Sequence, residues 1–243
     1  MSTIKHEYLW SVSNAPEDRF NMMIEQQNAL PGFDLKKGDL LFQLRKGGEL
    51  EWIISRLFAG YSGMALNHVA ISTGSGELVE AVMPRVQKTT LTQFIDKSVC
   101  DGLGRPCILV ARLKSTWQPL VDEALAFADE QLHIPYNSDF SPDSHSQSDI
   151  SNRAWYCSAL VLEAFRTANQ GKSVFPETPM GFRDLETGEV FPYWVEFYRK
   201  IGQPIPEGEP GSHPALLSCS DKLDVIKVMG QLPARQAANE QLA

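Results

Sequence analysis

Residues 155–165 read WYCSALVLEAF, and this stretch decides how the rest of the chain is interpreted. From Cys157 onward it contains neither proline nor glycine, and its apolar residues recur at the spacing of a helix that buries one face. The apolar positions are Leu160, Val161, Ala164, Phe165 and Ala168. The pattern predicts a buried helix that begins at Cys157.

The position of Cys157 suggests a nucleophile. The first N–H groups of a helix have no partner within the helix, and the helix dipole is positive at that end, so both favour a thiolate over a thiol. The alternative is a structural role, because a free cysteine is among the most buried residue types and usually behaves as a small apolar side chain. Whether Cys157 is catalytic or structural therefore depends on which side chains lie near it.

Composition indicates a globular chain with one large core. It has 243 residues, of which 43% are hydrophobic, and this is enough for a single substantial domain. We expect one domain over 1–243, with a core at about 35–202 and a C-terminal surface extension at 203–243. The extension is predicted because residues 203–214 are rich in proline and glycine, which is typical of a connector rather than a second core.

The charge and hydropathy of the chain argue against nucleic-acid binding and against a membrane-spanning segment. A net charge of −8 and a pI near 5.2 argue against a nucleic-acid-binding protein that neutralises phosphates. No apolar run approaches the roughly 18 residues of a membrane span, and residues 1–10 lack the pattern of a secretory signal. We therefore expect a cytoplasmic protein with no integral membrane segment.

The cysteines and histidines show no metal-binding spacing. The four cysteines, at 100, 107, 157 and 219, form no CxxC pair, and we interpret them as reduced thiols. The five histidines form no HExxH or paired Cys/His motif. We expect no metal site and no cofactor, and structural roles for Cys100 and Cys107.

A predicted hairpin carries a histidine and a carboxylate. The segments NHVAIS at 67–72 and ELVEAV at 77–82 read as strands on either side of Thr-Gly-Ser-Gly. A loop of three or five residues would set Glu80 directly opposite His68, with Cβ atoms about 5 Å apart, whereas a loop of two or four would set Ala81 there. A carboxylate beside an imidazole fixes its tautomer and stabilises its charged form, as in a catalytic triad. The alternative is a solvated histidine with a surface glutamate.

Other periodic segments predict the remaining elements. Strands are expected at 38–43, 85–89 and 107–113, and helices at 49–58, 91–97, about 117–132 and 194–201. We interpret Asp39 as a turn residue rather than a catalytic one. Residues 138–152 are polar and form a long loop that leads to Cys157 and can border the active-site cleft. His145 in that loop is interpreted as solvent-exposed.

Five short motifs make the sequence resemble the permuted branch of the NlpC-like papain-fold cysteine hydrolases, in particular the YiiX/YebB-like group. In chain order they are GDLLF at 38–42, NHVAI at 67–71, LVEA at 78–81, PY at 135–136 and YCSALV at 156–161. In ordinary papain-like enzymes the cysteine precedes the histidine, whereas here His68 precedes Cys157. The resemblance implies a circularly permuted α+β papain-like fold, with a small antiparallel sheet packed against the helix that carries Cys157.

The resemblance also implies roles for four residues. Cys157 would be the nucleophile, His68 the general base, Glu80 the residue that orients His68, and Tyr136 an active-site residue near the oxyanion or the substrate.

Two positions depart from the group's pattern. The group usually has an acidic residue where Ala159 stands and often has Asp where this chain has Asn137. Neither departure removes a proposed member of the triad, so we expect them to affect local hydrogen bonding or substrate preference.

These inferences predict a cysteine hydrolase of amidase or peptidase type that cleaves an amide or ester bond through a Cys-His-Glu triad and an acyl-enzyme. One alternative is a lipid-directed acyl hydrolase or acyltransferase that uses the same triad. Another is a catalytically silent binding protein of the same fold. The expected partner is a small-molecule, peptide or acyl-lipid substrate, and the sequence does not fix the oligomeric state.

Overall fold

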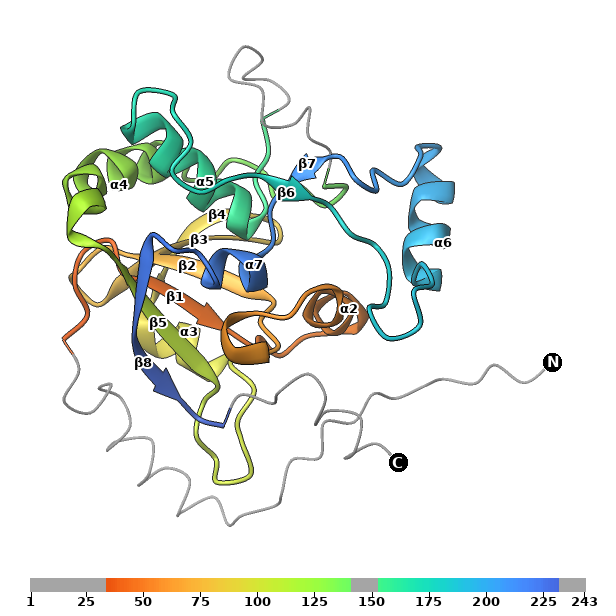
Figure 1. The fold of residues 1–243 in the computed structure, drawn as a ribbon, viewed down its shortest axis with the longest axis horizontal. Coiled ribbons are helices and arrows are strands. Elements are labelled where there is room, and N and C mark those ends of the chain that lie inside the picture. Colours follow the sequence, from red (N-terminus) through yellow and green to blue (C-terminus); the bar gives the residue numbers. More distant parts are fainter. Residues whose placement is uncertain (1–33, 141–152, 232–243) are drawn as a thin grey trace. The chain divides into compact units, whose positions relative to one another are not determined.

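An antiparallel sheet of six strands forms the centre of the computed structural model, which describes residues 34–140 and 153–231 (Figure 1). The strand order is β4-β3-β2-β1-β5-β8, and the helices and strands that the structure describes lie in one compact unit that begins at Lys36. The strands are β1 (Leu40–Gln43), β2 (His68–Ser72), β3 (Glu77–Val82), β4 (Arg85–Thr90), β5 (Ile108–Leu113) and β8 (Leu223–Met229). The α+β class and the antiparallel sheet are confirmed, and the strands and helices expected at 38–58, 85–97 and 107–132 are present within a few residues of their predicted ends.

The helices fall into two groups. Helices α4 (Val121–Glu130) and α5 (Cys157–Ala168) pack together on one side of the sheet, and α5 contacts β2 and β3 (Figure 1). Helices α2 (Glu49–Leu57) and α6 (Pro192–Ile201) share a second, aromatic-rich cluster. The shorter helices are α3 (Leu91–Asp96) and α7 (Pro214–Ser218), with 3-10 turns at Tyr61–Gly63 and Ser115–Leu120, and a small ladder joins β6 (Thr178–Pro179) to β7 (Pro210–Gly211).

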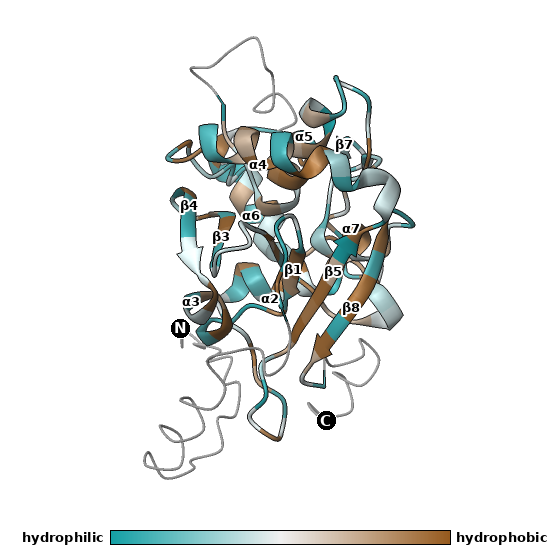
Figure 2. Cartoon of the chain, turned by 90° about the vertical axis from the view of Figure 1, so that its left-hand side faces the viewer, coloured by the Kyte–Doolittle hydropathy of each residue, from teal (hydrophilic) through white to brown (hydrophobic). Residues whose placement is uncertain are grey.

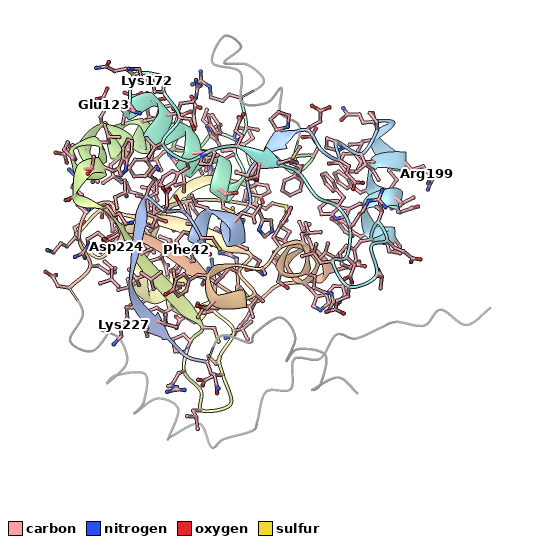
Figure 3. All side chains as sticks on the ribbon, viewed as in Figure 1. Phe42, Glu123, Lys172, Arg199, Asp224 and Lys227 are labelled. Carbon is pink, nitrogen blue, oxygen red and sulfur yellow. The ribbon has the colours of Figure 1, made fainter. Side chains whose placement is uncertain are left out.

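The main core lies between the sheet and α5. Alternate residues of β1 and β2, including Phe42 and Val69, pack with the buried face of α5, which includes Leu160 and Phe165. In Figure 2 much of β1 and β5 is brown, the colour of hydrophobic residues. Figure 3 shows Phe42 among the packed side chains of the interior, whereas Arg199 on α6 extends outward. The predicted face of the Cys157 helix is therefore the face that is buried.

The hairpin β2–β3 has a different register from the predicted one. Thr73 N donates to Glu77 O, so the turn holds only residues 74–76, and the glycines at both ends of that turn adopt positive φ angles of 82° and 85°. The turn is thus centred one residue later than the register that would pair His68 with Glu80. Ile71 pairs with Val79, and continuing this register sets Glu80 opposite Ala70. The prediction that Glu80 lies directly opposite His68 was wrong, although both side chains remain on one face as diagonal neighbours.

The segment expected to be a surface extension contains β7, α7 and β8 in its described part. Strand β8 pairs with β5 along its whole length, from Ile108 with Met229 to Leu113 with Leu223. Helix α7 contacts α5 and β2, and its Ala215 is fully buried. Residues 203–243 therefore add an edge strand to the sheet, which the sequence analysis did not predict. The single-domain boundary at 1–243 stays a prediction.

Asp39 has the structural role expected of it, with an additional partner. Its carboxylate is fully buried and accepts two hydrogen bonds from Arg112, from Nε at 2.6 Å and from Nη2 at 2.7 Å, and one from Lys36 N at 2.8 Å. Asp39 ties the turn before β1 to β5, because Arg112 belongs to β5.

Most of the loop expected at 138–152, including His145, lies outside the described part of the chain. Over residues 34–140 and 153–231, no helix is both long and apolar enough to span a membrane.

Candidate active site

His68 and Glu80 form a buried, hydrogen-bonded pair. Nε2 of His68 lies 2.7 Å from Oε2 of Glu80, and the two residues are 4% and 1% exposed. Phe94 of α3 packs beside the imidazole, with ring centroids 5.9 Å apart. The alternative of a solvated strand histidine with a surface glutamate is therefore wrong.

Cys157 meets His68 from the other side of the ring. It is the first residue of α5 and is 6% exposed, and its side chain is hydrogen-bonded to the side chain of His68. Because Nε2 faces Glu80, Nδ1 is the nitrogen left for the sulfur. Cys157 and the hairpin residues His68 and Glu80 thus form a chain of side-chain interactions: sulfur, imidazole and carboxylate.

The two charged groups, His68 and Glu80, perturb each other's pKa. Burial alone would lower the pKa of His68, but the hydrogen bonds with Cys157 and Glu80 and their charges raise it from 6.5 to about 9. Burial alone would raise the pKa of Glu80, but the hydrogen bond and charge of His68 lower it from 4.5 to about 2, with help from Gln87 and Arg45. At neutral pH the pair is therefore an imidazolium and a carboxylate.

Two residues that the sequence analysis missed hold the Glu80 carboxylate. Nε2 of Gln87 donates to Oε1 of Glu80 at 3.1 Å, and Nη1 of Arg45 lies 3.6 Å from Oε2. Gln87 belongs to β4, where it pairs directly with Glu80. The short turn between the strands at 77–82 and 85–89 was a signal that could have found it, because such a hairpin sets residues of equal distance from the turn opposite each other.

Asn67, which precedes His68, anchors the start of β2. Its Oδ1 accepts from Arg45 N at 2.7 Å, and its Nδ2 donates to the carbonyls of Arg45 and Glu51 at 3.1 and 2.9 Å. This side chain therefore ties the start of β2 to Arg45, which follows β1, and to Glu51 within α2.

Tyr136 is brought to Cys157 by backbone pairing. Trp155 N donates to Pro135 O and Asn137 N donates to Trp155 O, so the segment around Tyr136 runs parallel to the residues before α5. Tyr136 and Cys157 line one pocket. The packing around Tyr136 and the nearby charge of Cys157 raise its pKa well above the usual value, so the phenol keeps its proton and can donate a hydrogen bond.

The start of α5 supplies further donors. No side chain caps this helix, and its first backbone bond runs from Leu160 N to Tyr156 O. The N–H of Cys157 is therefore available to a negatively charged oxygen beside the sulfur. Ser212, which the sequence analysis did not single out, donates through its N–H to the Tyr156 hydroxyl at 3.0 Å and through Oγ to Ser158 Oγ at 3.0 Å, and so braces this helix end.

The other three cysteines lie in different settings. Cys107 is buried, and this burial raises the pKa of its thiol to about 12. Cys100 and Cys219 are exposed, and partial burial of the Cys100 thiol raises its pKa. All four cysteines are free thiols.

The solved structures include a similar protein. The crystal structure titled "metalloprotein yiiX from Escherichia coli O157:H7" aligns with a TM-score of 0.59 at 20% identity, over 83% of this chain and 100% of that chain. At this identity the likeness concerns the fold alone. In the part of this chain that the structure describes, no group of three or more His, Cys, Asp or Glu side chains converges to hold a metal ion. No curated protein matches the chain significantly.

A family model describes most of the sequence. The model of the permuted papain-like amidase enzymes, YaeF/YiiX, C92 family, matches residues 34–227. This range contains the six strands almost completely, the helices and all four predicted site residues. The resemblance to the YiiX-like permuted group is confirmed, and with it the permuted papain-like fold. The chain therefore belongs to the C92 family of permuted papain-like amidases.

Proposed function

We propose that the chain is a cysteine amidase in which Cys157 is the nucleophile, His68 transfers protons and Glu80 holds His68 in place. The observation that carries the proposal is the buried chain of side-chain interactions from Cys157 through His68 to Glu80, at the start of an uncapped helix. A nucleophile, a base and a residue that orients the base in hydrogen-bond contact are the signature of covalent acyl transfer.

In the first half-reaction, the sulfur of Cys157 attacks the carbonyl carbon of an amide or ester. A C–S bond forms, and the electron pair of the carbonyl moves to its oxygen. In this proposal the N–H of Cys157 and the protonated phenol of Tyr136, which lines the same pocket, stabilise this oxyanion. Collapse breaks the C–N or C–O bond, and the imidazolium of His68 gives its proton to the leaving amine or alcohol.

In the second half-reaction, neutral His68 removes a proton from a water molecule, which attacks the thioester. The C–S bond breaks, the acid product leaves, and His68 again holds the proton beside the Cys157 sulfur. Glu80 stays ionised throughout, because its pKa is lowered to about 2, and it stabilises the imidazolium in each resting state.

Two other functions make different predictions for the same residues. A lipid-directed acyl hydrolase or acyltransferase would form the same acyl-enzyme, and would differ in the acyl group or in the acceptor that replaces water. A silent binding protein would require no activated sulfur. The buried charge pair beside Cys157 favours catalysis, because an unused ion pair of this kind is costly to bury.

Alkylation by iodoacetamide at neutral pH, followed by mass spectrometry of each cysteine, tests the proposal without a known substrate. We expect Cys157 to react faster than the exposed Cys100 and Cys219, although it is far less exposed, and Cys107 to react slowest because its pKa is about 12. The fast reaction of Cys157 should disappear in His68→Ala.

The matched control is His133→Asn. His133 is exposed and has a φ angle of 73°, a conformation that Asn tolerates, so this variant removes an imidazole without disturbing the site. Its Cys157 should react at the wild-type rate. If Cys157 reacts no faster than Cys100 in the wild type, or keeps its rate in His68→Ala, the proposed mechanism is wrong and a binding role is the better hypothesis.

A further inference from the structure

A pocket adjoins Cys157 and has an apolar wall. The empty space in and around it, which includes open solvent, is about 480 Å³. Side chains from α2 and the residue after it, from Phe140, from residues 180–182 and from α6 form the wall. They include Leu57, Phe58, Phe140, Met180, Phe182 and Trp194.

The pocket carries no charged group that could pair with a charged substrate. None of its lining residues in the described part of the chain is Asp, Glu, Lys or Arg. Several of its polar side chains already have partners within the protein: His213 contacts Ile54 O through Nε2 and accepts from Ala215 N through Nδ1, and Asn67 is held as described above. Burial of a carboxylate or an ammonium group here would lack a counterion and would be strongly unfavourable.

Trp194 is the exception among these polar groups. It is 1% exposed, and its indole Nε1 is buried without a hydrogen-bond partner in the described structure. Phe140 and Phe182 pack edge-on against the ring, with centroids 5.5 and 5.3 Å away, and offer no oxygen acceptor through their side chains. A buried donor without an acceptor is unfavourable, and such a group in a native structure needs an explanation, such as an ordered water molecule, an ion or a functional role.

We propose that Trp194 is a specificity-determining residue and that the pocket binds the acyl part of the substrate, an uncharged, largely apolar group with one hydrogen-bond acceptor for Trp194 Nε1. This inference rests on the proposed function, because it takes Cys157 as the atom to which the acyl group becomes attached. It deepens that function by naming the acyl class: an aliphatic or aromatic acyl chain that carries one neutral oxygen, such as a ketone, an ether or an amide carbonyl. An acyl group with a free carboxylate or ammonium is excluded from this pocket.

The test uses p-nitrophenyl esters of acetate, of octanoate and of octanoates that carry one keto oxygen at successive carbons. Acylation of Cys157 is measured as p-nitrophenol release and by mass spectrometry. We expect octanoate to acylate Cys157 at least about tenfold faster than acetate, and at least one keto-octanoate to exceed octanoate by roughly ten- to a hundredfold in kcat/KM. In Trp194→Phe the gain from the keto oxygen should disappear.

Two further variants separate the N–H group from the shape of the ring. Benzothienylalanine at position 194 keeps the bicyclic ring but replaces the N–H by sulfur, and it should lose the keto gain while octanoate remains a good substrate. Trp52→Phe is the matched control, because Trp52 packs against the same aromatic cluster but does not line the pocket, and it should keep the gain.

The outcomes distinguish the two proposals. If no ester acylates Cys157, the proposed function fails, and this inference fails with it. If acetate acylates Cys157 but octanoate is no faster, or if the keto gain persists with benzothienylalanine at position 194, the amidase mechanism stands and the inference about Trp194 is overturned.

Discussion

Replacement of Glu80 by Gln should lower the pKa of His68. Gln has nearly the same size and can still hydrogen-bond to Nε2, so this change removes the negative charge and little else. In the wild type the pKa of His68 is raised from 6.5 to about 9, against the effect of burial. The charge of Glu80 is one of the two interactions responsible, and the interaction with Cys157 is the other.

The size of the effect follows from the geometry. One pKa unit corresponds to about 1.4 kcal/mol, so the surroundings favour the imidazolium by on the order of 3 kcal/mol relative to water. A carboxylate in direct contact with a cation shifts its pKa by about 1 to 3 units. We therefore expect the pKa of His68 in Glu80→Gln to fall by about 1 to 2 units, and the rate of Cys157 acylation at neutral pH to fall by roughly 100-fold or more.

Long-range ¹H–¹⁵N NMR of the imidazole rings measures the pKa directly, with the His68 signals assigned by their loss in His68→Gln. Glu77→Gln is the matched control, because Glu77 lies on the same strand but is exposed, and it should leave the titration unchanged. The double variant Glu80→Gln, Cys157→Ser removes both charges that favour the imidazolium, so the pKa of His68 should fall further than in Glu80→Gln alone.

Two results would refute this reasoning. One is a wild-type His68 that titrates near 6.5, because the ion pair with Glu80 would then not exist in solution. The other is a pKa near 9 that survives in Glu80→Gln, because the charge of Glu80 would then not be the cause of the shift.

Three further predictions concern stability and the surroundings of this pair. In urea unfolding, Glu80→Gln should lower the free energy of unfolding most between pH 4.5 and 6.5, where both groups of the wild-type pair contribute fully to stability. The contribution of Glu80 is present above pH 4.5 and is lost as the pH falls towards about 2. The contribution of His68 is present below pH 6.5 and is lost as the pH rises through about 9. A loss that does not depend on pH would contradict the ion pair. Gln87→Leu should raise the pKa of Glu80 and slow Cys157 acylation by about tenfold, because it removes the hydrogen bond to Oε1 of Glu80. An unchanged pH–rate profile would exclude Gln87 from the site. Asp39→Asn should lower the free energy of unfolding by roughly 3 kcal/mol because it removes the buried carboxylate that accepts two hydrogen bonds from Arg112. A loss below about 0.5 kcal/mol in urea unfolding would show that this pair is not needed.

Local patterns predicted the helix of Cys157 and the hairpin of His68 because both depend on periodicities of a few residues. The helical spacing after Cys157 set which face is buried, and alternation along the strands set His68 and Glu80 on one face. The predicted register of the β2–β3 hairpin was wrong because the register depends on where the turn begins. Thr73 can belong to the loop or to the ladder, and the choice shifts every pair in the hairpin.

Long-range partners were missed for a different reason. Strand β8 pairs with β5 across more than a hundred residues, and the proline- and glycine-rich segment before it gave the impression that the core had ended. Trp194 was expected on a short helix, but its place in the pocket that Cys157 also lines depends on how α6 packs against α2, which no local pattern encodes. Such contacts are properties of the folded chain and not of any one segment.

The protonation states on which the proposed chemistry depends are, like these long-range contacts, properties of the folded chain. Burial disfavours charge on both His68 and Glu80, so each group is ionised only because the other lies 2.7 Å away. Each also has a second partner, since Gln87 donates a hydrogen bond to Glu80 and Cys157 is hydrogen-bonded to His68. Removal of one partner therefore does more than delete one hydrogen bond, since it leaves the other charge buried without compensation. For this reason the single variants should be more damaging than their contact distances suggest, and the double variant Glu80→Gln, Cys157→Ser, in which His68 can become neutral, should recover part of the stability that Glu80→Gln alone loses.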